Sequence, residues 1–171
     1  MGRFLASIPQ GTSIILVDNG SSDLAETRAL AKAHNALLIT NQTNLGFGSA
    51  CNQGAAASQS EFLFFVNPDS FLEATTITAL ESAAAAKPEA SAFNPQIIDS
   101  RGRVSFKRRS CLLSANEIMA PIAPKNDSQV PVLTGAALFL SKQNFDRICG
   151  FDENIFLYHE DDDISIRLRK Q

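Results

Sequence analysis

Hydrophobic and polar residues follow a repeated order in the first half of the chain: a short apolar run, a polar loop and a longer helix-forming segment. The apolar runs predict buried strands at 13–17, 36–40 and 61–66. The segments after them predict helices over about 23–34, 48–57 and 75–86. Because strands that alternate with helices are joined by right-handed crossovers, this order predicts an α/β protein with a largely parallel sheet.

The order changes after Pro88. Residues 107–129 are rich in proline, asparagine and basic side chains, so we expect them to run over the surface. The rest of this half predicts extended runs at 91–98, 104–106 and 130–140, and helices over about 142–148 and from 161 onward. We find no internal repeat and no linker, so the sequence predicts one domain that covers residues 1–171.

Length and composition narrow the class of protein. A chain of 171 residues with 44% apolar and 19% charged side chains is typical of one globular domain. A net charge of −3 gives no support for nucleic-acid binding. Cys51, Cys111 and Cys149 lack C-x-x-C spacing, which favours a reducing compartment. No apolar run approaches the roughly 18–20 residues that span a bilayer and no signal peptide is recognisable, so we expect a cytoplasmic protein.

Polar clusters stand where each predicted strand ends, at 18–21, 44–48 and 67–69. Each cluster alone suits an ordinary turn or helix cap. Ligands of open α/β sheets bind beyond the carboxyl ends of the strands, so the repetition favours a shared cleft. Asp69 directly follows the most hydrophobic strand, and its carboxylate suits either a turn or a hard divalent cation with diphosphate oxygens and water as further ligands.

A second concentration of chemistry is the acidic run Glu160–Asp163, which follows His159. Acids in a first helical turn oppose the positive end of the helix dipole, so capping is one interpretation. A general base is the other, because crowding raises the pKa of a carboxylate. For His159 we favour an ordinary polar contact over a ligand or a proton carrier.

The triplet Lys107-Arg108-Arg109 forms a compact basic patch. A solvated surface loop is the favoured interpretation. Phosphates of a substrate or of an anionic lipid headgroup are the alternative, which leaves a peripheral contact with the inner membrane face open.

Several segments, taken in order, carry a family resemblance: D-N-G-S-S-D at 18–23, N-L-G-F-G at 44–48, N-P-D at 67–69, T-G-A-A-L at 134–138, G-F-D-E at 150–153 and E-D-D-D at 160–163. They resemble the family 2 glycosyltransferases, particularly the rhamnosyltransferase-like branch, over nearly the whole chain. The resemblance implies a GT-A-like fold with a mixed, mainly parallel sheet flanked by helices. It also implies a nucleotide-sugar-binding half at 1–88 and an acceptor-side half at 89–171.

The resemblance further implies an inverting transfer of a sugar, such as rhamnose, from a nucleoside-diphosphate donor to a glycan or lipid-linked acceptor in polysaccharide synthesis. Asp161 would be the general base, supported by Glu160 and Asp163. Asp69 would bind Mg²⁺ or Mn²⁺. The donor would be held by Asp18, Asn19, Asn44, Gly46, Asn52 and Asn67.

Two departures from the family pattern shape further expectations. Asn67 stands where many relatives carry the first acid of D-x-D, so metal binding is expected to be weak. Residues 1–8 are typical of the helix that follows the family's first strand, and we therefore expect this strand to be missing and the chain to stop within its last helix. A truncated, catalytically silent domain that binds a nucleotide or a partner is accordingly the alternative function.

Overall fold

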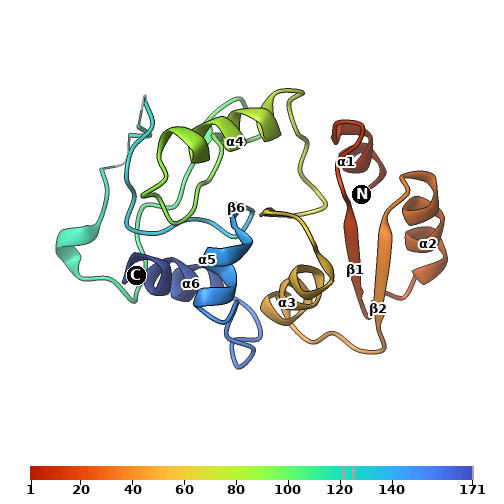
Figure 1. Cartoon of the computed structure of the whole chain (residues 1–171). Helices are drawn as coiled ribbons and strands as arrows, with labels where there is room; N and C mark the ends of the chain where they lie inside the picture. Colours follow the sequence, from red (N-terminus) through yellow and green to blue (C-terminus); the bar gives the residue numbers. More distant parts are fainter. Residues whose placement is uncertain (121, 125, 171) are drawn as a thin grey trace.

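The three predicted strand–helix units are all present in the computed structural model, which describes residues 1–120, 122–124 and 126–170 (Figure 1). Helix α1 (Gly2–Ser7) comes first, as the sequence of residues 1–8 predicts. The units after it are β1 (Ile15–Asn19), α2 (Leu24–Ala33), β2 (Leu37–Asn41), α3 (Phe47–Ala57), β3 (Phe62–Val66) and α4 (Thr76–Ala86). Asp23 caps α2, because its Oδ1 accepts the backbone N–H of Glu26 at 3.2 Å.

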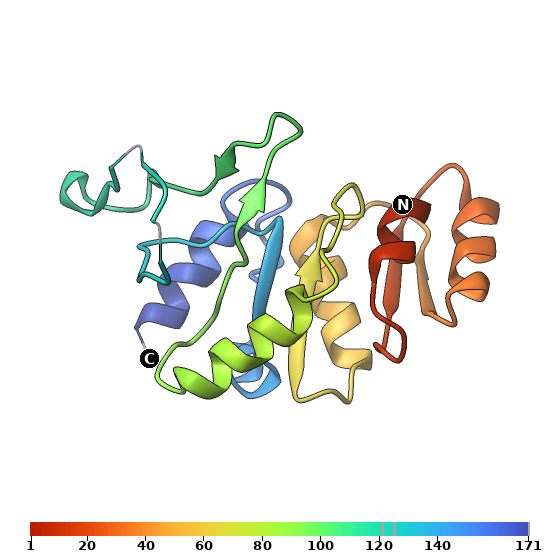
Figure 2. The ribbon, with the colours of Figure 1, turned by 90° about the horizontal axis from the view of Figure 1, so that it is seen from above.

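The second half contains fewer regular elements. They are β4 (Ile97–Ile98), β5 (Val104–Ser105), the 3₁₀ turn η1 (Ala115–Glu117), β6 (Ala137–Ser141), α5 (Lys142–Arg147) and α6 (Glu160–Arg169). β4 and β5 pair antiparallel, and the chain from there through η1 runs along the side of the molecule remote from β1 and β2 (Figure 2). Two residues of the predicted surface excursion, Pro121 and Lys125, and Gln171 of the predicted last helix lie outside the described residues.

The extended run predicted at 130–140 becomes a strand only in its last part. Before β6, side chains from elsewhere in the chain bind the backbone. Asn94 Oδ1 accepts the N–H of Thr134 at 2.8 Å, and Ser165 Oγ accepts the N–H of Leu133 at 2.9 Å. These bonds replace the ladder that a strand would need.

The strands pair in a mixed pattern, which agrees with the α/β class. β1 and β2 are parallel, with Ile15 opposite Leu37. β3 instead pairs antiparallel with β6, with Val66 opposite Ala137, so the sheet is less parallel than the repeated units predict. The reason is that the partner of β3 is β6, a strand from the second half of the chain, and not β1. Among the described residues, β1 and β3 do not pair with each other.

Two apolar clusters hold these elements together. On one side, Phe4 and Leu5 of α1 pack with residues of β1 and β3, including Leu16 and Phe64. On the other side lies the larger cluster, which joins α3, β3, β6, α5 and α6. The rings of Phe65 and Phe151 meet in this cluster with their centroids 5.5 Å apart.

Helix α6 is anchored in the larger cluster by Ile164 and Leu168, which are 0% and 3% exposed. Burying each such side chain stabilises the fold by about 1.5–3 kcal/mol. The packing fixes the first turn of α6, and therefore the acidic run, relative to β6. Among the residues that the structure describes, no helix is long and apolar enough to cross a bilayer.

Candidate active site

Asp18 lies at the end of β1 and is buried, with 5% of its surface exposed. Its Oδ1 accepts the backbone N–H of Ser21 at 2.9 Å, and this bond holds the pKa of Asp18 below its usual value. Its Oδ2 is buried without a hydrogen-bond partner among the described residues. A buried carboxylate oxygen is costly without a partner, so Asp18 is suited to accept a hydrogen bond from a ligand.

Asn19 joins the loops that follow β1 and β2. Its Nδ2 donates to Asn44 Oδ1 at 2.9 Å and to the carbonyl of Gly46 at 3.0 Å. Its Oδ1 accepts Asn41 Nδ2 and the N–H of Leu45, each at 3.0 Å. Every donor and acceptor of this amide is therefore used, and the two loops form a rigid rim.

One part of this rim, the contact between Asn41 and Gln53, is not predicted by the sequence. Asn41 and Gln53 exchange amide hydrogen bonds at 2.8 and 3.1 Å, which attaches α3 to the end of β2. The two residues lie 12 positions apart, one on a strand and one on the following helix, so no local pattern predicts the pair.

Gly46 connects the rim with the acidic half of the molecule. It has φ of 91° and ψ of 163° at the start of α3, a conformation almost confined to glycine. A Cβ atom there would lie 2.5 Å from the carbonyl oxygen of Phe156. The same carbonyl accepts the N–H of Phe47 at 3.3 Å. The close approach of these two backbones therefore requires a glycine.

Asn52 points from α3 to the loop before the acidic run. Its Oδ1 accepts the N–H of Phe151 at 2.9 Å, and its Nδ2 donates to the carbonyl of Phe151 at 3.0 Å and to Glu153 Oε1 at 3.1 Å. These contacts fix the G-F-D-E loop against α3. A role of Asn52 in the nucleotide pocket stays a prediction.

Asn67 and Asp69 lie in the turn after β3. The N–H of Asn67 donates to the carbonyl of Ala136 at 3.1 Å, and its carbonyl accepts the N–H of Ser70 at 3.1 Å. Asp69 is exposed and has no hydrogen bond or ion pair among the described residues. No three His, Cys, Asp or Glu side chains gather as a metal site in the described part of the chain. One exposed carboxylate fits an open site in which diphosphate oxygens and water complete the shell, but not a closed protein cage.

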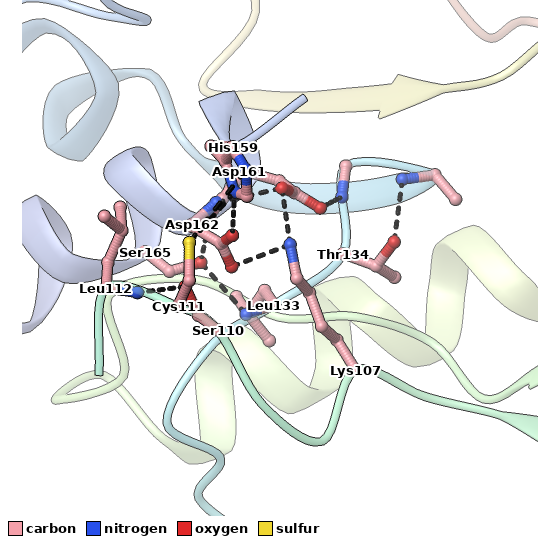
Figure 3. A network of polar contacts seen from close by, with 12 residues as sticks. Lys107, Ser110, Cys111, Leu112, Leu133, Thr134, His159, Asp161, Asp162 and Ser165 are labelled. Atoms are coloured by element: carbon pink, nitrogen blue, oxygen red, sulfur yellow. Dashed lines mark hydrogen bonds and ion pairs between the residues drawn. The ribbon is translucent and has the colours of Figure 1, made fainter. Parts of the chain in front are cut away.

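Asp161 in the first turn of α6 is held by three donors (Figure 3). Its Oδ1 lies 2.6 Å from Lys107 Nζ and accepts the N–H of Asp162 at 2.9 Å. Its Oδ2 accepts the N–H of Gly135 at 3.1 Å. The loop before β6 therefore lies directly against the predicted base.

The interpretation of the basic triplet as a solvated loop is wrong for Lys107, whereas Arg109 is exposed. Besides Asp161, Lys107 Nζ contacts Asp162 Oδ1 at 2.7 Å, and 22% of the lysine side chain is exposed. Burial alone would lower the pKa of Lys107, but the bonds to the two acids outweigh it and raise that pKa. Lys107 comes from the segment after β5 and lies between the two adjacent carboxylates. Its positive charge offsets the cost of burying their negative charges.

Asp162 is the most buried acid of the cluster, with 2% of its surface exposed. Its Oδ2 lies 3.0 Å from Nδ1 of His159, which confirms a polar contact for that histidine. Burial would raise the pKa of Asp162, but Lys107 and His159 outweigh it and hold that pKa below its usual value. His159 itself has φ of 68°, so the residue before α6 is in a left-handed conformation that is uncommon outside glycine.

The other two acids face different partners. Asp163 Oδ2 accepts Arg167 Nε at 2.8 Å, and Arg167 also donates to the carbonyls of Ile148 and Gly150. Glu160 has a buried Oε2 with no hydrogen-bond partner among the described residues. Burial first, and then the Glu160 charge, raise the pKa of the Cys51 thiol far above its usual value. Support of Asp161 by Glu160 or Asp163 stays a prediction, because neither contact is present.

These pieces form one continuous path of contacts. Asn19 binds Gly46, which touches the chain at Phe156 just before the acidic run. Asp161 binds Gly135, and the neighbouring Ala136 accepts the N–H of Asn67 at the start of the N-P-D turn. The strand-end loops and the acidic run are therefore linked by contacts along one edge, and a shared ligand cleft there stays a prediction.

The fold and this edge define a class of protein. The chain matches a mannosyltransferase from Pyrobaculum calidifontis in complex with GDP-Man and Mn²⁺ with a TM-score of 0.66, at 16% identity over 91% of this chain and 42% of that one. It matches residues 1–349 of S. aureus TarS with a TM-score of 0.66, at 18% identity over 97% of this chain and 50% of that one. The α/β fold is that of the GT-A glycosyltransferases, as the sequence predicts.

The family model "Glycosyl transferase family 2" matches residues 3–148, and the chain belongs to this family. A relative is the N-acetylglucosaminyl-diphospho-decaprenol L-rhamnosyltransferase of Mycobacterium tuberculosis, which is 32% identical over an alignment of 201 positions. The alignment covers 98% of this chain and 66% of the length of that relative.

Proposed function

We propose that the chain transfers a sugar of the rhamnose class from a nucleoside-diphosphate donor to a hydroxyl group of a glycan or lipid-linked acceptor. Family membership and the rhamnosyltransferase relative support the reaction class. The observation that carries the proposal is the placement of Asp161, whose Oδ2 touches the loop that also holds the N-P-D turn.

The donor nucleotide would bind at the ends of β1 and β2. Asp18 Oδ2, buried and without a partner among the described residues, would accept an N–H of the base. The rim that contains Asn19, Asn44 and Gly46 would support the nucleoside, since its amides already hold one another in place. Asn52 and Asn67 would complete the pocket from α3 and from the turn after β3.

The diphosphate would lie by Asp69. This carboxylate would hold Mg²⁺ or Mn²⁺, and the cation would neutralise the departing nucleoside diphosphate. Because Asn67 replaces a second acid and no further acid or histidine joins Asp69 in the described part of the chain, we expect weak metal binding without a donor.

Asp161 would act as the general base. An acceptor hydroxyl would lose its proton to the Asp161 carboxylate while its oxygen forms a bond to the anomeric carbon of the sugar. The bond from that carbon to the diphosphate oxygen breaks in the same step, and the nucleoside diphosphate leaves. A single displacement of this kind inverts the anomeric centre.

The acceptor would approach over the residues that precede the acidic run. Phe156, Leu157 and Tyr158 are exposed by 55%, 54% and 73%, an apolar surface suited to a sugar face or to the lipid end of a carrier. A lipid-linked acceptor would place the protein at the cytoplasmic face of a membrane.

A catalytically silent domain that binds a nucleotide or a partner is the second candidate. One observation favours it: β1 and β3 each have a single paired edge among the described residues, so the sheet is interrupted beside the predicted nucleotide site. Such a domain would bind a nucleotide without turnover.

The deciding experiment measures release of nucleoside diphosphate from dTDP-rhamnose and other sugar nucleotides, with Mn²⁺ and a diphosphate-linked N-acetylglucosamine acceptor. We expect multiple turnover, reduced about 100-fold or more in Asp161→Asn because the proton acceptor is lost. Asp146→Asn is the control, since the side chain of Asp146 is 58% exposed and, among the described residues, pairs only with Lys142. Tight calorimetric binding of nucleotide without turnover would support the silent domain instead.

A further inference from the structure

Lys107 is the only described lysine that contacts the acidic run, and it comes from a distant part of the chain. It follows β5 and lies 54 residues before Asp161. Figure 3 shows its side chain reaching from the surface excursion to the first turn of α6, between the carboxylates of Asp161 and Asp162.

The two oxygens of the Asp161 carboxylate have different hydrogen-bond partners. An ionised carboxylate offers about four lone-pair directions, two on each oxygen. Lys107 Nζ and the N–H of Asp162 use both directions on Oδ1. The N–H of Gly135 uses one direction on Oδ2 and leaves one open. The lysine therefore makes Oδ2 the oxygen with room for another donor.

The second partner of Lys107 fixes the lysine itself. Asp162 is 3% exposed in its side chain and has Lys107 on Oδ1 and His159 on Oδ2. Asp162 therefore holds Lys107 in place beside Asp161. The other groups around the pair are Glu160 and Asp163 on α6 and the Cys111 thiol, which lies 3.7 Å from His159 Nδ1. Lys107 is thus the cation that faces Asp161 directly.

We propose that Lys107 is a positioning residue for the general base: it occupies Oδ1 of Asp161 and presents Oδ2 to the acceptor hydroxyl. This inference rests on the proposed function, since it gives a part of the same reaction to a residue that does not touch the donor. The opposite role would be a plug, in which Lys107 blocks Asp161 until an acceptor displaces it. The two roles predict opposite effects of removing the charge.

The test compares K107M and K107R with R109M. Arg109 is exposed, belongs to the same triplet and has no hydrogen bond or ion pair among the described residues, so R109M should match the wild type. For K107M we expect kcat to fall by about tenfold or more while the KM for dTDP-rhamnose stays within about threefold, because ground-state binding of the donor is untouched. K107R should recover most of the lost kcat, since it keeps the charge.

A second readout does not depend on turnover. The ¹³C NMR signal of the Asp161 carboxyl carbon should shift in K107M at constant pH, because Oδ1 loses its contact with Lys107. The spectra are recorded for the protein without substrate. K107Q, which keeps a hydrogen-bond donor without the charge, replaces K107M if K107M does not fold.

The outcomes separate the two proposals. A wild type without turnover on any donor contradicts the proposed function, and the NMR signal of Asp161 then still decides the placement of Lys107. An active wild type with equal or higher kcat and lower acceptor KM in K107M would identify a plug and overturn the positioning role. An Asp161 carboxyl signal that does not shift in K107M, or a folded K107R as inactive as K107M, would overturn it as well.

Discussion

The two polar regions of this molecule are built in opposite ways. The rim at the ends of β1 and β2 consists of neutral amides, and Asn19 satisfies each of its donors and acceptors with its neighbours. The acidic run at the start of α6 consists of four carboxylates, and its central pair is held by Lys107 from another segment. The amide of Asn19 is satisfied by neighbouring residues of the rim, whereas the acidic run depends on the positive charge of Lys107 from a distant segment.

The difference follows from the chemistry of the side chains. An amide carries both donors and an acceptor, so asparagines can pair with one another at no cost in charge. Carboxylates only accept, and a buried one such as Asp162 needs a cation or several N–H donors. The positive end of the helix dipole at the start of α6 stabilises these negative charges in part, but not enough for adjacent acids. The acid cluster is therefore the region where removal of one side chain should have the larger effect.

The largest effect is expected from Asp162→Ala. This change removes the partner of Lys107 and His159 from a site with 2% exposure and leaves a half-buried ammonium with one acid. We expect the free energy of unfolding to fall by about 3 kcal/mol, as for other broken buried pairs. Urea denaturation at neutral pH measures it.

The matched control for this change is Asp146→Ala, which breaks a lysine–aspartate pair on the surface of α5. Exposed pairs of this kind contribute about 0–1 kcal/mol. If both variants lost the same small amount of stability, the acid cluster would be no more dependent on its cation than a surface pair, and the contrast between the two regions would fail.

Gly46→Ala is expected to have the next largest effect, because it disturbs the backbone conformation of the rim. The residue has φ of 91°, and an added Cβ would lie 2.5 Å from the Phe156 carbonyl oxygen. Strain of this kind costs of the order of 1–3 kcal/mol, and we expect about 2 kcal/mol with loss of nucleotide binding. Thermal unfolding and nucleotide titration measure the two effects.

Gly102→Ala separates the clash from the conformation. Gly102 has φ of 75° in the β4–β5 turn, and nothing lies within 4 Å of an added Cβ. We expect about 1 kcal/mol or less from its left-handed backbone alone. Equal losses in both variants would mean that the approach of Phe156 to Gly46 contributes nothing.

The same contrast explains what the sequence could predict. The strand ends and the helices that follow them come from short apolar runs and local turn chemistry, and the structure contains them. Lys107 was misinterpreted as solvated, because its triplet lies in a polar segment and its partners are 54 and 55 positions further along the chain. The Asn41–Gln53 pair and the antiparallel pairing of β3 with β6 were missed for the same reason: each depends on tertiary packing without a local pattern.

The smallest expected effect concerns Asp18, a charged residue next to the neutral rim. An asparagine at position 18 still accepts the N–H of Ser21, but as a neutral acceptor it binds it less strongly. We expect Asp18→Asn to lower the free energy of unfolding by about 1 kcal/mol at neutral pH. Urea denaturation over a series of pH values measures this difference.

The pH dependence gives the sharper result. The pKa of Asp18 is lowered in the folded protein, chiefly by the Ser21 N–H, from an ordinary value of 3.8. The stability due to its charge is therefore complete above the unfolded pKa and is lost as the pH falls through the folded pKa. The wild type should lose more stability than Asp18→Asn between about pH 5 and pH 2, so the two curves should converge on acidification. Parallel curves would show that the folded protein does not stabilise the charge of Asp18. Asp127→Asn, at an exposed position, is the control and should follow the wild type throughout.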